Sequence, residues 1–200
     1  MTRVWRPGRM AALAVTLALP LALAACTSAP PALYTIAPVQ GAEQQGGPRV
    51  ILLQQIGLAR YLERSQIVRS SENYRLDVMQ NDWWGEPLGA MVGRVLVDEL
   101  GQRLPQSVVL NENGAVSSPA DATIELSLRR LDEDAAGNLV LTAQAAVTFK
   151  TRPTPALRSF RFTVPPPAPG VPGEVAAISG AIGQLADGLA PMLLAGPSAQ

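Results

Sequence analysis

The sequence contains no histidine, and its 200 residues include a single cysteine, Cys26, and a single lysine, Lys150. Without histidine, histidine-based catalytic triads and histidine-ligated zinc sites are excluded. A Ser–Lys dyad would have to use Lys150, and no serine beside it has the context of a nucleophile. Because one cysteine cannot form an intramolecular disulfide, the folded domain must be held together by its hydrophobic core.

The carboxylates give little support for catalysis or metal binding. Asp82 with Glu86, or Asp98 with Glu99, could in principle carry out acid–base chemistry on a glycan. Asp98 and Glu99 are adjacent in a predicted helix, so they point to different sides and are more simply interpreted as solvated charges. Residues 132–134 are acidic but lack the spaced ligands of an EF-hand, which favours a hairpin tip. Since there is no glycine-rich phosphate motif either, we expect no enzyme, no metal and no cofactor.

Residues 1–25 have the composition of an export signal. Arg3, Arg6 and Arg9 precede an apolar run at residues 10–25, which is the order of the n-region and h-region of a signal peptide. The run is shorter than the roughly 20 residues of a spanning helix and contains a proline, so a permanent transmembrane anchor is the weaker interpretation. Its removal leaves 13 basic against 16 acidic residues, a net charge of −3. This charge does not favour nucleic acid as a partner.

The end of the apolar run, Leu23-Ala24-Ala25-Cys26, resembles the bacterial lipobox. We therefore expect cleavage before Cys26 and attachment of a diacylglyceride to its thiol, with several acyl chains holding the mature protein on a membrane. The alternative is an ordinary secretory cleavage site followed by an incidental cysteine. Residue 27 is threonine and not the aspartate typical of lipoproteins kept in the inner membrane of enterobacteria. The resemblance therefore implies the outer membrane.

Residues 26–48 are rich in Pro, Ala, Gly and Gln and hold few large apolar side chains. Such a composition cannot compensate the entropy lost on folding, so it predicts a flexible, lipid-anchored tether. About twenty residues at roughly 3 Å each would hold the domain up to about 60 Å from the membrane. Residues 33–36 alternate in polarity, which leaves two interpretations open: an edge strand docked on the domain, or an apolar patch in a disordered linker.

Residues 49–196 carry the patterns of a single α/β domain. Apolar residues at helical spacing predict two main amphipathic helices, at 87–104 and 174–194. A hairpin is predicted at 132–138, where Gly137-Asn138 supplies the positive φ of the turn. We expect a mixed sheet of about five to seven strands with both helices packed on it. Dense or alternating apolar runs place these strands at 49–53, 67–69, 74–79, 107–110, 122–131, 139–149 and 158–164.

Two adjacent tryptophans, Trp83 and Trp84, precede the first predicted helix in a chain with an aromatic content of 4%. If the backbone is extended there, their side chains point to opposite faces, so one can be buried in the core and the other cannot. The second tryptophan is then either half-covered by its own domain or an anchor for a binding partner. The sequence leaves both interpretations open.

Two stretches are similar to known signatures: YLERSQIV at residues 61–68 and NDWWGEPL at residues 81–88. Together, at this spacing and after a lipobox, they resemble the ABC-type transport auxiliary lipoprotein family, which includes the paraquat-inducible protein C lipoproteins. The similarity covers essentially the whole mature chain, although Ser65 stands where the family frequently has proline. The matching residues are Tyr61, Leu62, Arg64, Gln66, Trp84, Glu86 and Pro87, with Trp83 beside them.

The resemblance implies a compact α/β domain like the anticodon-binding fold, and it is compatible with a homo-oligomeric ring. It also implies a non-enzymatic role in lipid traffic. The lipoprotein would couple the periplasmic assembly of a mammalian-cell-entry-type (MCE) transport system to the outer membrane, while ATPase and permease lie in the inner membrane. The expected partners are thus the membrane and an MCE-domain protein. Two alternatives remain: a periplasmic lipoprotein that binds a lipid or another hydrophobic ligand, and a cell-wall enzyme that uses Asp82 and Glu86.

Overall fold

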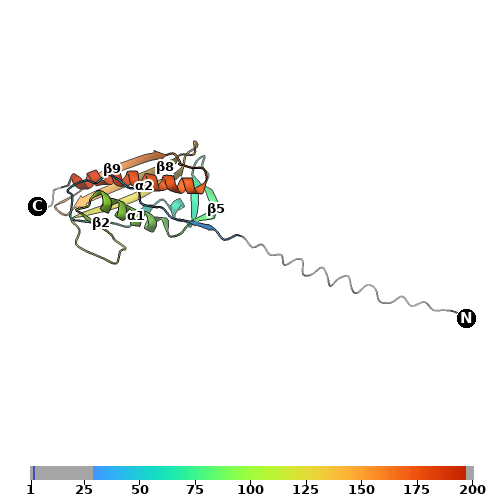
Figure 1. Cartoon of the computed structure of the whole chain (residues 1–200), viewed down its shortest axis with the longest axis horizontal. Helices are drawn as coiled ribbons and strands as arrows, with labels where there is room; N and C mark the ends of the chain where they lie inside the picture. The colour runs from blue at the N-terminus through green and yellow to red at the C-terminus, as the bar shows by residue number, and fades with distance from the viewer. Residues whose placement is uncertain (1, 3–28, 197–200) are drawn as a thin grey trace. The chain divides into compact units, whose positions relative to one another are not determined.

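The structure is a computed structural model that describes residue 2 and residues 29–196 (Figure 1). The predicted signal peptide and the lipidation site at Cys26 lie outside these residues. Residues from Pro31 onward belong to one structural unit. Its described part contains two α-helices, α1 (Leu88–Arg103) and α2 (Val171–Leu194), a short 3-10 helix, η2 (Arg60–Leu62), and nine strands: β1 (Ala32–Tyr34), β2 (Val50–Leu53), β3 (Gly57–Leu58), β4 (Gln66–Ser70), β5 (Asp77–Trp84), β6 (Val108–Asn111), β7 (Ala122–Glu133), β8 (Leu139–Phe149) and β9 (Arg152–Val164).

β7 is the central strand of the sheet, and its two edges are occupied differently. One edge pairs with the antiparallel strand β8, which in turn pairs with β9. The other edge is shared by three successive segments, β2, β3 and β4, which all run parallel to β7. Beyond them, β6 pairs with β2, β5 pairs with β4, and β1 is added beside β5. The sheet is mixed, as predicted, but this part of the chain supplies nine strands rather than five to seven.

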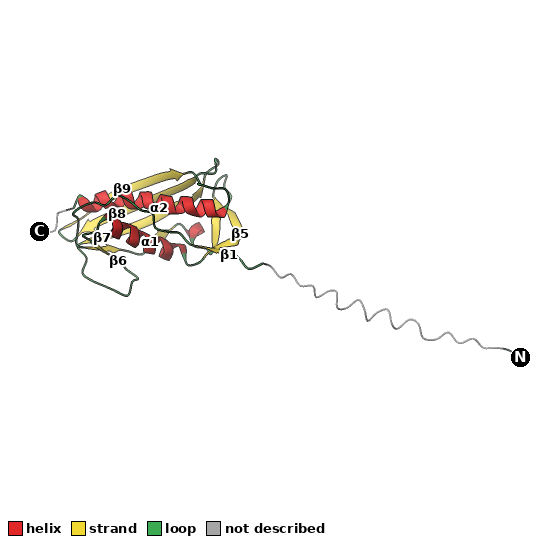
Figure 2. Ribbon diagram, in the orientation of Figure 1, coloured by secondary structure: helices red, strands yellow, loops and turns green. Residues whose placement is uncertain are grey.

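Both helices lie on one face of the sheet (Figure 2). The strands beneath them show the alternation that this arrangement requires, since Ala143 and Ala145 of β8 are buried whereas Gln144 is exposed. α1 buries one stripe of apolar residues at helical spacing. α2 is long and apolar enough to cross a membrane by length and composition, but 67% of its most apolar window is buried in the domain. α2 is therefore the second core helix that the sequence predicts.

Residues 31–48 are folded onto the domain, so the flexible tether predicted for residues 26–48 is wrong over this part. β1 pairs with β5, which selects the edge-strand interpretation of residues 33–36. The next residues, 35–48, are called the strap here; they contact both helices and bury the side chain of Ile36 to 2% exposure. The N–H of Ala37 donates to Ser179 Oγ of α2 at 3.2 Å, and the N–H of Gln44 donates to the carbonyl oxygen of Arg103 of α1 at 2.7 Å. Composition is a poor guide here because backbone groups, more than large apolar side chains, hold the strap.

Three element boundaries also differ from the sequence prediction. β5 spans Asp77–Trp84 instead of residues 74–79, because Asn73 and Tyr74 adopt a positive φ in the turn before it. β9 begins at Arg152 instead of residue 158 and includes Pro153 and Pro155. These prolines are tolerated because β9 pairs with β8 alone and is an edge strand, where a missing N–H removes no ladder hydrogen bond. α2 begins at Val171 instead of residue 174, with a proline in its first turn, where the N–H would have no helical partner.

Candidate functional site

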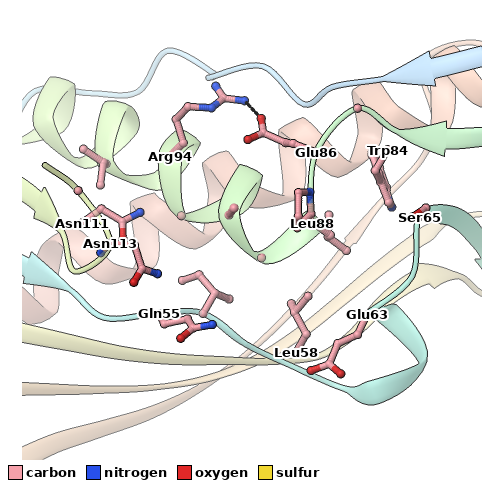
Figure 3. Close-up of a pocket in the computed structure, with 18 of the residues that line it drawn as sticks. Gln55, Leu58, Glu63, Ser65, Trp84, Glu86, Leu88, Arg94, Asn111 and Asn113 are labelled. Carbon is pink, nitrogen blue, oxygen red and sulfur yellow. Dashed lines mark hydrogen bonds and ion pairs between the residues drawn. The ribbon is translucent and has the colours of Figure 1, made fainter.

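A groove of about 920 Å³ lies where the two signature stretches meet, between the start of α1 and the β3 segment (Figure 3). β2 and β4 each have an outer neighbour in the sheet, β6 and β5, whereas β3 pairs with β7 alone. The position next to β3 therefore carries no strand from the described residues, and the groove opens there. Its walls include Gln55, Leu58, Arg64, Ser65, Trp84, Glu86, Leu88, Arg94, Asn111 and Asn113.

The wall that α1 contributes includes three small residues, Gly89, Ala90 and Gly93. A Cβ atom at Gly93 would lie 2.9 Å from Asn111 Nδ2 at the end of β6. A Cβ atom at Gly89 would lie 3.5 Å from the carbonyl oxygen of Ile56, just before β3. At Gly93 a larger side chain would displace its neighbour, so glycine permits the close approach of helix and sheet that shapes the groove.

The first signature stretch contains residues that hold the fold and one that faces the groove. Leu62 is 3% exposed and belongs to the core. Tyr61 Oη donates to Asp132 Oδ2 at 2.7 Å, and the same buried carboxylate accepts from Arg130 Nε at 2.8 Å. Burial and the bond to Asp132 raise the pKa of Tyr61, so its hydroxyl stays protonated as the donor. η2 is thereby fixed on the sheet, and the exposed Arg64 that follows it lines the groove.

In the second stretch, Trp83 and Trp84 are consecutive residues of an extended strand and differ in burial as predicted. Trp84 is 7% exposed and belongs to both the core and the groove wall. Trp83 is half-buried, lies opposite Gln66 of β4, and donates its indole N–H to the carbonyl oxygen of Gln80 at 2.9 Å. The backbone N–H of Trp84 donates to the carbonyl oxygen of Ser65 at 2.7 Å, which joins the two stretches directly. A role of Trp83 as a partner-binding anchor stays a prediction.

Glu86 and Pro87 form the rim of the groove at the start of α1. The Glu86 carboxylate pairs with the Arg94 guanidinium at 2.5 Å, and both side chains are partly exposed. Pro87 precedes the first helical residue, and its carbonyl oxygen accepts the N–H of Met91 at 3.1 Å. An exposed ion pair contributes at most about 1 kcal/mol to stability. The main effect of the pair is to present two opposite charges at the groove entrance.

A buried ion cluster on the other end of α1 is absent from the sequence prediction. Arg103 is 1% exposed and pairs through Nε with Asp187 Oδ1 of α2 at 2.6 Å. Its remaining guanidinium N–H groups donate to the carbonyl oxygens of Val39 in the strap at 3.2 Å and of Gly183 in α2 at 3.1 Å. A single side chain therefore joins both helices and the strap.

Glu99, four residues before Arg103, is also 1% exposed, so its interpretation as a solvated charge is wrong. Its Oε1 accepts the N–H of Val39 at 2.8 Å, while Oε2 has no hydrogen-bond partner. Burial raises the pKa of Glu99 to about 7, although the Val39 N–H and the Arg103 guanidinium both act to lower it. The neighbouring Asp98 is exposed, as the prediction of opposite sides requires. The i, i+4 spacing of Glu99 and Arg103 within the apolar stripe is the signal that could have revealed the pair.

The carboxylates considered for catalysis are engaged in other interactions. Asp82 accepts a hydrogen bond from Tyr34 Oη at 2.9 Å, and Glu86 is paired with Arg94. Within residue 2 and residues 29–196, no three potential ligands gather into a group that could hold a metal ion.

Residues 34–190 match the family described as "ABC-type transport auxiliary lipoprotein component". The chain belongs to this family. The resemblance carried by the two signature stretches is therefore confirmed. The family description is that of a transport accessory and a lipoprotein, and it names no enzymatic activity.

Solved structures with the same fold are distant in sequence. An uncharacterized protein is 16% identical, with 82% of this chain and 98% of the other covered at a TM-score of 0.68. A protein from Xanthomonas campestris, assigned to the family DUF330, is 17% identical, with 83% of this chain and 95% of the other covered at a TM-score of 0.66. At these identities the comparisons show the fold alone. No curated protein matches the chain.

Proposed function

We propose that the protein is a non-enzymatic accessory lipoprotein of an MCE-type ABC transport system, which couples a periplasmic lipid-transport assembly to the outer membrane. The thiol of Cys26 carries the lipid, and the domain described here faces the periplasm. Family membership supports the transport role. The observation that carries the partner-binding part is the convergence of both signature stretches on one groove.

The groove suits an extended segment of a partner protein. The N–H of Ala59 donates to the carbonyl oxygen of Leu128 in β7 at 2.9 Å. Because alternate residues of a parallel strand direct their N–H and C=O groups to opposite edges, those of Leu58 point away from β7, toward the groove. A partner segment that pairs with this edge would fill the vacant strand position between β5 and β6.

Side chains around this edge would give the interaction its specificity. Leu58 and Trp84 offer apolar contacts, whereas Arg64, Glu86 and Arg94 place charges at the rim. Charged groups at a rim affect association rate and partner choice more than affinity. The groove therefore combines a backbone edge, an apolar floor and a charged border, which is the composition of a peptide-binding site.

Site-specific photo-crosslinking in cells tests the proposal. A photoreactive amino acid is introduced in place of Asn113 or Asp98, which are exposed residues that line the groove. The control position is Leu157 of β9, which is 76% exposed and next to the core-packed Ala156, so it points to the helix-free face. We expect adducts with an MCE-domain protein from the two groove positions and none from the control.

Two other outcomes would decide against partner binding. Adducts with an MCE-domain protein from Leu157 alone would place the interface on the opposite face of the sheet. Adducts that contain lipid but no protein would favour the second candidate function, a lipoprotein that holds a lipid in its own domain. The volume of about 920 Å³ and the apolar residues Ile56, Leu58 and Trp84 in the groove are the features that support this second candidate.

A further inference from the structure

The folded domain begins very close to the expected lipid anchor. β1 starts at Ala32, so five residues separate it from Cys26. At roughly 3.3–3.6 Å per residue, the chain from Cys26 to Ala32 reaches at most about 20 Å. A flexible tether of the whole segment 26–48 would have allowed about 60 Å. The β1 end of the domain is thus confined to the neighbourhood of the membrane surface, provided that Cys26 is lipidated as proposed above.

One row of side chains at this end is apolar or uncharged, while Arg69 and Asp77 form an exposed ion pair farther along β4 and β5. Leu33 in β1 is 67% exposed and lies beside Trp83 of β5 in the parallel register. Paired residues of neighbouring strands point to the same face, so Leu33, Trp83 and Gln66 form a row across β1, β5 and β4. None of the three carries a charge. Since the indole N–H of Trp83 is already bonded to a backbone oxygen, the ring can lie in an apolar setting without losing a water partner.

The turn between β4 and β5 adds a second apolar element. Tyr74 is 110% exposed, and Leu76 is 40% exposed. Tyr74 has a φ of 61° and follows Asn73 with a φ of 55°, a left-handed conformation that is uncommon for an aromatic residue. The six residues from Leu76 to Asp82 span about 20 Å along β5, so the turn lies within a distance similar to the reach of the anchor.

We propose that the surface along β5, from Leu33 and Trp83 at one end of the strand to Tyr74 and Leu76 at the other, rests in the headgroup region of the membrane that holds the Cys26 lipid. The inference depends on the proposed lipidation. Tryptophan and tyrosine favour the membrane–water interface because their rings are apolar and their N–H and O–H groups are polar. A weak intrinsic affinity is sufficient, because the short chain to the anchor keeps the local concentration of lipid high. The groove, which begins on the far side of β5 near Trp84, is then held at a fixed height above the membrane.

Fluorescence quenching by brominated lipids tests this inference. The chain without residues 1–25 contains two tryptophans, Trp83 and Trp84. The lipidated protein is reconstituted into vesicles of phosphatidylethanolamine and phosphatidylglycerol, with or without bromine on the upper part of the acyl chains. We expect brominated vesicles to lower the emission of the wild-type protein. The matched variant W83F retains only the buried Trp84 and should lose this quenching.

Two further samples separate the inference from the lipidation on which it rests. The variant C26S, which has no site for the lipid, should neither float with vesicles nor be quenched. Mass measurement of the N-terminal peptide shows whether the wild-type protein carries its lipid, and absence of lipid there would contradict the proposed anchor instead. The inference is overturned if the protein carries its lipid and binds the vesicles but has the same tryptophan emission in plain and in brominated vesicles. In that case a protein partner or a second copy of the chain, detected by crosslinking through position 33, would be the occupant of this surface.

Discussion

Replacing Glu99 by glutamine should change how the stability of the domain depends on pH. Burial raises the pKa of Glu99 from 4.5 to about 7. Between pH 4.5 and about 7, the carboxyl group of Glu99 therefore stays protonated in the folded protein, whereas it ionises in the unfolded chain. The resulting contribution to stability is complete below pH 4.5 and is lost as the pH rises through about 7. Glutamine stays neutral at every pH, and its amide oxygen can still accept the N–H of Val39.

The size of the effect follows from the two pKa values, 4.5 in the unfolded chain and about 7 in the folded protein, because each tenfold change in the ionisation constant corresponds to 1.36 kcal/mol. Compared with wild type, E99Q should have a similar free energy of unfolding at pH 4.5 and one about 3 kcal/mol higher at pH 8. Burial is also the chief cause that raises the pKa of Glu174 to about 8. The wild-type protein therefore has a second group whose contribution to stability is lost as the pH rises. Because both proteins contain Glu174, its contribution cancels in the difference between them.

Urea unfolding of the mature chain, made with C26S so that it stays in solution, measures this difference from pH 4.5 to pH 8.5. The fluorescence of the buried Trp84 reports the transition. The control variant D98N changes the neighbouring carboxylate, which is exposed and is the smallest of the influences that raise the pKa of Glu99, so its difference from wild type should vary with pH far less than that of E99Q. A difference between E99Q and wild type that is equally flat would show that Glu99 ionises normally, and the argument from burial would then be refuted.

Two further substitutions test the packing of the helices by the same unfolding measurement. R103M should lower the free energy of unfolding by about 2–5 kcal/mol, because it leaves the carbonyl oxygens of Val39 and Gly183 without their donor, at about 1–3 kcal/mol each. R94M, at the exposed pair, should change it by less than about 1 kcal/mol, and equal losses would contradict the assigned burial. G173A should lower it by about 1–3 kcal/mol, since a Cβ atom there would lie 1.7 Å from the carbonyl oxygen of Ala168. G101A has no atom within 4 Å of its new Cβ and should raise the free energy of unfolding by up to about 1 kcal/mol through helix propensity; a loss in G101A would contradict this reasoning.

Local periodicity predicts the large elements of the fold well. β8 spans residues 139–149 as predicted, because every second residue must face the helices and be apolar. The same logic places α1 within one residue at each end. β3 was not predicted, because two residues are too few to show a period. Its strand geometry comes from pairing with β7 and not from its own sequence.

The strap and the ion cluster show where local patterns end. Residues 35–48 carry few large apolar side chains, and their order comes from backbone hydrogen bonds to side chains on α1 that lie about 60 residues away in sequence. The strap and α2 together cover Glu99 and Arg103. The strap has no local signal of its own, and the i, i+4 spacing of Glu99 and Arg103 gains its meaning only from these two distant segments.

The candidate site was predictable in part. Resemblance identified the residues of the two signature stretches, and alternation separated Trp83 from Trp84. The groove itself depends on a vacant position beside β3, which is a property of sheet topology and not of any residue pattern. Arg94, Asn111 and Asn113, which line the groove, carried no signal in the sequence.

The strap also makes the folding of the first part of the domain depend on the last. Its bond from Ala37 to Ser179 joins residues 142 positions apart, so the strap can dock only after the last helix is in place. Contacts between distant segments slow folding because the loop between them must close first. Until α2 has formed, Ile36 and the buried face of α1 lack part of the core that covers them. The same requirement means that a chain truncated before α2 should remain unfolded.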